Sequence, residues 1–380
     1  MMKIGLPKET RVDEARVGLT PDSIKKLCKK GFRVLVERSC GLKAGFPDPA
    51  YQMDGVELVD ARGAFGADLV LKLHRPTPEE VSQMKSGSLL ISFMDPFIRD
   101  GLMEKLAQAG VDALAMELIP RTSRAQSMDA LSSQANIAGY RAVIEAVSQY
   151  GRFFPLMMTS AGSSKPAKVM VLGAGVAGLQ AIATAKRLGA VIEAYDVRSE
   201  VKEQILSLGA KFVELNVGEE GTGQGGYAKE LSEEGKKRQQ QLLTERLQKC
   251  DVIISTANIP GRKAPILITE EAVQGMRAGS VIIDMAAANG GNCPLSEPDR
   301  VVEKHHVKIV GFTNYPSLMA ADASGFYGQN LIALLNLMIV EPSKDQANSQ
   351  TGQLSLNLNL EDDIIAAALV THRGQVRFKK

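Results

Sequence analysis

The segment KVMVLGAGVAGLQAIATAKRLGAVIEAYD, residues 168–196, constrains the fold of this chain more than any other stretch. A short apolar run leads into three glycines spaced GxGxxG, then into a helical pattern, and then into a second apolar run. This is the order of a strand, a crossover helix and a parallel strand, in which the turn and the helix N-terminus can bind the pyrophosphate of a dinucleotide. The middle of the chain is therefore predicted to form a doubly wound α/β domain.

Each glycine of this turn has a physical reason. Gly173 permits the tight turn, Gly175 lets the backbone approach the pyrophosphate, and Gly178 allows close packing of helix on strand. The next strand ends at Asp196, where a carboxylate can bind the adenosine ribose and repel a 2′-phosphate, which favours NAD(H). Arg198 could instead accept that phosphate, but we interpret it as a helix-start residue that points to solvent. The predicted cofactor contacts in this domain are Gly173, Gly175, Val176, Ala177, Gly178, Asp196, Val197, Arg198, Thr256 and Ala257.

A chain of 380 residues is too long for one ordinary core, so two domains are expected. Strand-like and helical runs alternate in the N-terminal region as they do in the middle, which predicts parallel sheets in both. We expect the helix at 324–340 to return the chain to the first domain. The predicted fold is α/β, with two Rossmann-like doubly wound domains separated by a cleft. The first is discontinuous, 1–132 with 324–380, and the second spans 133–323.

Several element ends can be predicted from local signals. Thr20 followed by proline is typical of a helix N-cap, and a second helix is expected from a cap at Ser132 or Ser133 to a stop at Gly151. The apolar period of that second helix is set by Ile137, Tyr140, Ile144 and Val147. Strict alternation of leucine in LSLNLNL, residues 354–360, predicts a half-buried strand.

Composition excludes several classes of function. No apolar run reaches the roughly 18 residues needed to span a bilayer, and the N-terminus has no signal-peptide pattern, so we expect an intracellular protein. A formal net charge of +2 and the absence of Trp argue against a nucleic-acid partner. His305 and His306 are adjacent but have no further ligands nearby in sequence, so we interpret them as loop residues and predict no metal site.

A glycine-rich stretch, residues 216–235, interrupts the second domain. Its composition cannot hold a rigid shape, and in a dinucleotide domain such a loop can close over the cofactor. Gly226 and Tyr227 are its predicted cofactor contacts. A surface insertion without that role remains the alternative.

Longer motifs resemble a known family. MELIPRTSRAQSMDALSSQANIAGYRAV, the glycine-rich fingerprint, GGYAKE and AGSVIIDMAAANGGNCPLSEP are similar to the NAD(H)-binding components of proton-translocating NAD(P) transhydrogenases, in the alanine dehydrogenase/transhydrogenase family. The resemblance implies direct hydride transfer between NAD(H) on this chain and NADP(H) on a partner component. It further implies a membrane-embedded proton-translocating partner, a homodimer, and a peripheral position on the cytoplasmic face of the inner membrane.

The resemblance also assigns residues in the run 121–132. Arg121, Gln126 and Asp129 match nicotinamide-contacting, catalytic positions, and Ser132 matches a further cofactor contact. Gln126 and Ser132 can hydrogen-bond carboxamide or ribose groups, and Arg121 and Asp129 can pair and fix the loop. Hydride transfer between two nicotinamide rings requires positioning rather than acid–base catalysis, and the run contains neither His nor Cys.

Two other functions remain open. Alanine dehydrogenase, in the same wider family, would use Arg16 and Lys72 to hold substrate, but Asp95 stands where its pattern has a His, and an ordinary Asp is ionised at neutral pH. We interpret Arg16 and Lys72 as structural or electrostatic residues. A non-catalytic NAD(H)-sensing module is the third possibility.

Overall fold

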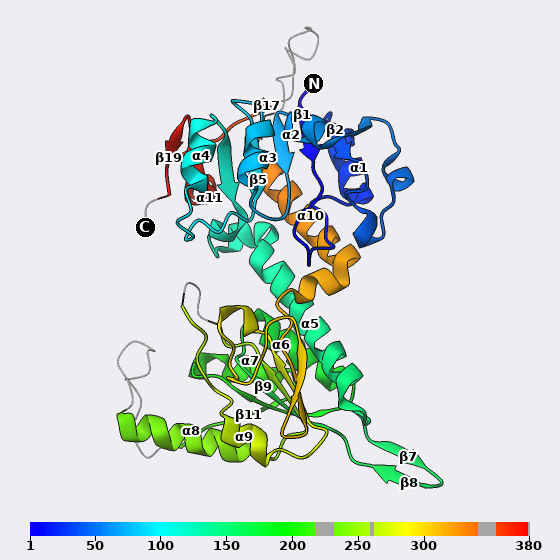
Figure 1. Ribbon diagram of the computed structural model, residues 1–380, viewed down its shortest axis with the longest axis vertical. Helices are drawn as coiled ribbons and strands as arrows, with labels where there is room; N and C mark the ends of the chain where they lie inside the picture. The colour runs from blue at the N-terminus through cyan, green and yellow to red at the C-terminus, as the bar shows by residue number, and fades with distance from the viewer. Residues whose placement is uncertain (217–231, 259–261, 341–354, 379–380) are drawn as a thin grey trace. The chain divides into compact units, whose positions relative to one another are not determined.

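The computed structural model describes residues 1–216, 232–258, 262–340 and 355–378. The chain forms two compact units: unit 1 comprises Met1–Gln134 with Pro316–Lys380, and unit 2 comprises Ala135–Tyr315 (Figure 1). The helix α5, Ala130–Tyr150, contributes to both units. The limits expected from the sequence, 132 and 324, fall inside α5 and the helix α10, Ala320–Met338, whereas the second limit between the units lies at Tyr315–Pro316, directly after the irregular residues 311–314.

Unit 1 is built on a sheet whose described strands have the order β19-β18-β6-β5-β4-β1-β2-β3. Its strands are β1 Lys3–Leu6, β2 Arg33–Glu37, β3 Val56–Val59, β4 Leu69–Leu71, β5 Leu89–Ser92, β6 Asp112–Ala115, β18 Leu369–His372 and β19 Gln375–Val376. The pairs among β1 to β6 are parallel, as the alternating pattern predicted. The strands β18 and β19 extend one edge in antiparallel orientation.

Helices cover both faces of this sheet. They are α1 Pro21–Lys29, α2 Ala61–Phe65, α3 Pro78–Gln83, α4 Leu102–Gln108, α10 Ala320–Met338 and α11 Asp363–Ala368. Leu69 and Leu71 pack in one cluster with residues of α1 and α10, whereas Val70 packs in another with residues of α3 and α4. The predicted cap of α1 is confirmed, because the Thr20 side chain accepts a hydrogen bond from the N–H of Ser23.

The most apolar helix, α10, belongs to the core of unit 1. Tyr327, Leu331, Leu334 and Leu335 are fully buried there. Burial inside the unit explains a sequence as apolar as LIALLNLM. Within the described ranges, no helix combines the length and the hydropathy needed to cross a membrane.

The strand predicted at 354–360 is shorter than expected. Leu354 lies outside the described residues, and among positions 355–360 only β17, Ser355–Leu356, is a strand, which pairs with the two-residue β16, Ile339–Val340. The side chain of Asn359 accepts a hydrogen bond from the N–H of Glu361, and such a local bond favours a turn. The N–H of Asn357 still donates to the carbonyl of Met338 at 2.8 Å, so the backbone pairing extends one residue beyond β17 and stops before the turn at Asn359.

Unit 2 has a second sheet, ordered β11-β10-β9-β12-β13-β15-β14. Its strands are β9 Lys168–Leu172, β10 Val191–Tyr195, β11 Lys211–Phe212, β12 Val252–Ser255, β13 Val281–Asp284, β14 Val301–Lys304 and β15 Val307–Val310. Only β14 is antiparallel to its neighbour among these described strands. The other helices are α6 Val176–Arg187, α7 Lys202–Ser207, α8 Glu233–Leu247 and α9 Glu270–Gly275. Both units are therefore doubly wound α/β sheets of Rossmann type.

The buried face of α5 in unit 2 differs in part from the prediction. Tyr140 is 39% exposed, and the core contacts are made by Ala138, Ala142, Val143 and Ala146. Ile137 is 6% exposed and Val147 packs against the unit 2 core, so the predicted period holds at these two positions and fails at Tyr140.

Candidate functional site

The glycine-rich turn of unit 2 joins β9 to α6. Gly173 has a φ of 92°, a conformation that side chains rarely adopt. A Cβ at Gly178 would lie 1.8 Å from the carbonyl oxygen of Gly173, so α6 can pack on the turn only without a side chain there. A Cβ at Gly175 would meet no atom within 4 Å. Internal packing therefore requires Gly173 and Gly178, whereas open space lies beside Gly175.

No described side chain caps the N-terminus of α6. Gly175 is its N-cap residue and has no side chain to accept from the first-turn N–H groups. Those groups and the positive end of the helix dipole can therefore bind an external anion. Val176 is 40% exposed at this end of α6. Ala177 packs closely on α5, since a Cβ at Gly139 of α5 would lie 2.1 Å from the carbonyl oxygen of Ala177. Open space, backbone donors and a helix N-terminus coincide here, which fits a phosphate group.

Thr256 and Ala257, which follow β12, are packed beside this turn. The Thr256 hydroxyl donates to the carbonyl of Gly173 at 3.0 Å. The side-chain amide of the fully buried Asn292 donates to the carbonyls of Ala257 and Pro265, both at 2.8 Å. Asn292 thus fixes the loop after β12, and sequence reasoning did not find it. The only signal was its place in the motif ANGGN after a buried strand.

Asp196 lies directly after β10, and its side chain is 6% exposed. It accepts hydrogen bonds from the N–H of Ala174 at 2.7 Å and from two guanidinium nitrogens of Arg198, both at 3.0 Å. Burial opposes its ionisation, but the bonds from Arg198 and Ala174 outweigh burial and lower its pKa. As predicted, Arg198 stands at a helix start, since it is the N-cap residue of the 3-10 helix η5, Ser199–Val201, and its side chain is 50% exposed. The sequence did not predict that its guanidinium also pairs with Asp196. Val197, between them, is 70% exposed.

Two predicted contacts cannot be placed. Gly226 and Tyr227 lie outside the described residues. The described chain resumes at Ser232, which caps α8 by accepting from the N–H of Gly235 at 3.0 Å.

In unit 1, the run 121–132 forms the 3-10 helix η4, Ser123–Met128, and the start of α5. Ala125 and Met128 are buried in the unit 1 core and anchor η4. Arg121 and Gln126 are exposed. The segment is therefore anchored by apolar side chains, while its two predicted cofactor-contacting polar residues face outward.

Asp129 caps α5, and the predicted cap at Ser132 or Ser133 is wrong. The Asp129 carboxylate accepts hydrogen bonds from the N–H of Ser132 at 2.8 Å and from the Ser132 hydroxyl at 2.6 Å. A carboxylate is a stronger acceptor than a hydroxyl at a helix N-terminus, so the earlier residue takes the cap. In the described structure the Asp129 carboxylate bonds to Ser132, and the predicted pairing with Arg121 is not formed.

Two family models match the chain, namely the N-terminal domain of alanine dehydrogenase/PNT over residues 5–138 and its C-terminal domain over residues 142–379. The chain belongs to the alanine dehydrogenase/PNT family. It is 47% identical to an NAD(P) transhydrogenase subunit alpha protein of Rhodospirillum rubrum, over 99% of this chain and 97% of that protein.

Solved structures of the same family superpose on it. The transhydrogenase of Sinorhizobium meliloti gives a TM-score of 0.83 at 41% identity and covers 98% of each chain. An L-alanine dehydrogenase gives a TM-score of 0.77 at 26% identity, over 99% of this chain and 96% of the other.

In this member of the alanine dehydrogenase/PNT family, Arg16 is buried in an internal ion pair. Its Nε and Nη2 donate to Glu14 at 2.8 and 2.7 Å, and its Nη1 donates to Gln134 at 2.8 Å. His74 Nε2 lies 2.6 Å from the same carboxylate. Burial opposes ionisation of Glu14, but the bonds from Arg16 and His74 outweigh it and hold its pKa well below the usual range.

Lys72 is also paired internally. Its ammonium donates to Glu80 at 2.8 Å and lies 3.8 Å from Glu9, and its side chain is 1% exposed. Asp95 has a φ of 47°, and its N–H donates to Glu117. The structure thus gives Arg16 and Lys72 the structural ion-pair role that the sequence left undefined.

Proposed function

We propose that this chain is the NAD(H)-binding component of a proton-translocating NAD(P) transhydrogenase and that it holds NAD(H) for direct hydride exchange with NADP(H) on a partner component. The observation that carries the proposal is the uncapped N-terminus of α6 with open space beside Gly175. The family of the chain, and its 47% identity to an NAD(P) transhydrogenase subunit, support the same conclusion.

Asp196 supports NAD(H) rather than NADP(H) at this turn. Its lowered pKa keeps the carboxylate ionised at neutral pH, so it can accept from ribose hydroxyls and would repel a 2′-phosphate. Arg198, the cation that could have bound that phosphate, is already paired with Asp196.

We propose that the nicotinamide end contacts Arg121, Gln126 and Asp129, and that Ser132 makes a further cofactor contact. The Ser132 hydroxyl donates to Asp129, so its oxygen is left to accept from a carboxamide or ribose group. The nicotinamide supplies the hydride chemistry. The side chains of this chain orient the ring. Direct hydride transfer requires no proton from them, so catalysis rests on positioning.

The test compares Gln126→Ala with Arg124→Ala, since both residues lie in η4. Arg124 is a matched control because its guanidinium pairs with Asp362 and Asp363. NADH is mixed with an NADP(H)-binding transhydrogenase component, and hydride exchange is followed with a nicotinamide analogue of distinct absorbance. Gln126→Ala should slow exchange by on the order of 100-fold with NADH affinity nearly intact. Equal losses of rate and affinity would contradict its role in ring placement.

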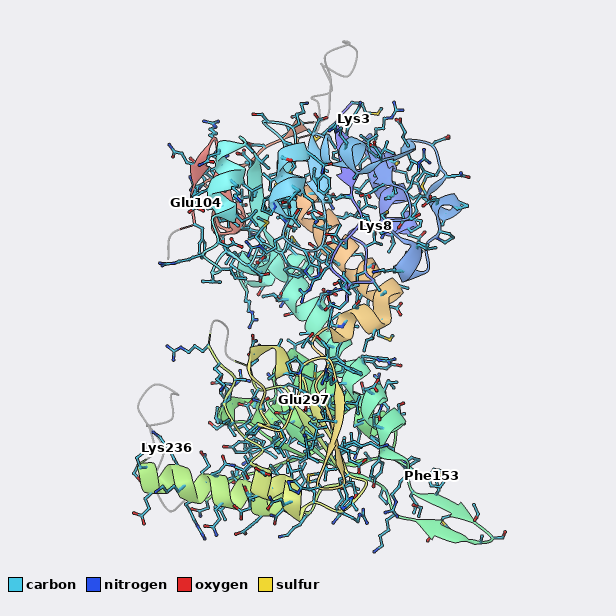
Figure 2. The ribbon with its side chains drawn as sticks, viewed as in Figure 1. Lys3, Lys8, Glu104, Phe153, Lys236 and Glu297 are labelled. Carbon is cyan, nitrogen blue, oxygen red and sulfur yellow. The ribbon has the colours of Figure 1, made fainter. Side chains whose placement is uncertain are left out.

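We also propose that this chain forms a homodimer. The hairpin of β7, Met157–Thr159, and β8, Gly162–Ser164, projects from unit 2 (Figure 1). Leu156, Met158 and Phe153, the last labelled in Figure 2, are more than half exposed near it. Such an apolar surface suits a contact with a second copy. Met158→Lys should shift sedimentation from dimer toward monomer, and an unchanged dimer would exclude this contact.

The proton path and the membrane attachment are assigned to partner subunits, which would place this chain peripherally on the cytoplasmic face of the inner membrane. Fractionation with and without those partners tests this position. Recovery of the chain on membranes that lack them would contradict it.

An alanine dehydrogenase activity is the second candidate, favoured by the fold similarity to L-alanine dehydrogenase. The internal ion pairs of Arg16 and Lys72 oppose it, because both cations already hold carboxylates. Rapid NADH consumption on addition of pyruvate and ammonia would establish it. A purely NAD(H)-sensing module would show neither that reaction nor hydride exchange.

A further inference from the structure

A buried asparagine on α10 braces the segment that we assign to the nicotinamide. Asn330 is 7% exposed. Its side-chain N–H donates to the carbonyl of Ser127 at 2.8 Å, and its side-chain oxygen accepts from the Ser133 hydroxyl at 2.7 Å. A backbone carbonyl can only accept, so the chemistry of Ser127 fixes which end of the amide faces it.

The two bonds hold the segment on both sides of the turn at Asp129. Ser127 follows Gln126 in η4, and Ser133 follows Ser132 in the first turn of α5. Between them lies Asp129, where η4 ends and α5 begins. One side chain therefore links the backbone carbonyl of Ser127 to the side chain of Ser133, and both residues adjoin proposed ligand contacts.

The helix that carries Asn330 is well suited to this task. Its neighbours Tyr327, Leu331 and Leu334 are fully buried in the core of unit 1. A side chain on such a helix has little freedom, so its hydrogen bonds transmit the rigidity of the core to the segment. Ala125 and Met128 anchor η4 by contact, but apolar contact does not fix the turn at Asp129.

We propose that Asn330 is a positioning residue for hydride exchange, acting through Ser127 and Ser133 to hold Gln126 and Ser132 in register. This inference rests on the proposed function. A misplacement of about 1 Å can cost on the order of 100-fold in rate. Loss of the brace should therefore lower kcat far more than it weakens NADH binding, because the α6 turn is untouched.

The experiment uses Asn330→Asp and Asn330→Ala, with Tyr327→Phe as the matched control. Tyr327 lies one turn earlier on α10 and donates to the carbonyl of Lys72 at 2.9 Å, so the control loses a buried hydrogen bond that does not reach the segment. Exchange is measured with NADH and the NADP(H)-binding component, and NADH affinity is measured separately. Both Asn330 variants should lose on the order of 10- to 100-fold in kcat, with NADH affinity and Tyr327→Phe near wild type.

The pH profile separates positioning from general stability. In Asn330→Asp the ionised carboxylate opposes the Ser127 carbonyl, but a protonated carboxyl again supplies a donor. The ratio of its exchange rate to wild type should therefore rise as pH falls. A flat ratio, a wild-type rate, equal losses of kcat and NADH affinity, or failure of both variants to fold would overturn the proposal. No exchange by the wild-type chain would instead overturn the proposed function.

Discussion

The close approach at Gly178 predicts a specific cost for Gly178→Ala. The new Cβ would lie 1.8 Å from the carbonyl oxygen of Gly173, whereas carbon and oxygen need about 3.3 Å. The α6 helix would therefore have to move by about 1.5 Å relative to the turn. Overpacking of this kind costs about 3 kcal/mol or more, and the better helix propensity of Ala offsets about 1 kcal/mol. We expect a net loss of about 2 kcal/mol in the free energy of unfolding.

Gly175→Ala is the matched comparison on the same turn. Its Cβ would meet no protein atom within 4 Å, and the residue has a φ of −76°, which alanine adopts readily. Only the poorer N-cap preference of Ala opposes it, by about 0.5 kcal/mol. A phosphate beside this position would meet the new methyl group, so NADH affinity should fall by about tenfold or more, equivalent to about 1.4 kcal/mol.

Thermal unfolding without ligand and NADH titration by calorimetry measure the two effects separately. For a unit of 150 to 250 residues, about 2 kcal/mol corresponds to a fall in Tm of roughly 4–8 °C for Gly178→Ala. Wild-type stability of Gly178→Ala would refute the packing argument. Wild-type NADH affinity of Gly175→Ala would refute the assignment of the pyrophosphate to this turn.

Three further changes test the buried polar groups. Lys72→Met should lower the free energy of unfolding in urea by about 3–5 kcal/mol, because Glu80 then keeps a buried charge without its cation. Adding Glu80→Gln should restore part of this loss. If the losses of the two single variants simply add in the double variant, the two residues do not act as a pair. Glu14 has a lowered pKa, so its contribution to stability is present above its ordinary pKa of 4.5 and is lost as pH falls. The free energy of unfolding should therefore fall more steeply from about pH 5 to about pH 3 in wild type than in Glu14→Gln, and parallel curves would contradict this. Asn292→Ala leaves two part-buried carbonyls without their donor and should cost about 1–2 kcal/mol in denaturant titration, whereas a near-neutral change would mean that water replaces the amide.

Local patterns were sufficient to predict the fold class and the packing of the glycine-rich turn. Alternating strand-like and helical runs predict parallel sheets, because each run selects its own secondary structure and a crossover connection leaves few topologies. The roles of Gly173 and Gly178 were likewise predictable, since their constraint arises within a few residues of chain. The cap of α1 at Thr20 is local in the same sense.

The errors lie where two local signals competed. Asp129 and Ser132 are both good helix caps, and only the folded geometry shows that the carboxylate takes the cap and the hydroxyl donates to it. The ion pair of the half-exposed Arg198 with Asp196 was also missed, because nothing in the sequence indicates it.

By itself, the sequence determined the order of strands and helices in the two sheets and the turn at Gly173–Gly178, because those depend on neighbouring residues. Only the tertiary structure decided how the run 121–132 is held, since Asn330 reaches it from about 200 positions away. It also decided that Asn292 supports the loop after β12. Hydrogen bonds between distant segments leave no periodic signal in a sequence. Each such bond depends on a single polar side chain, and the group that it contacts is often a backbone atom, which any residue type supplies.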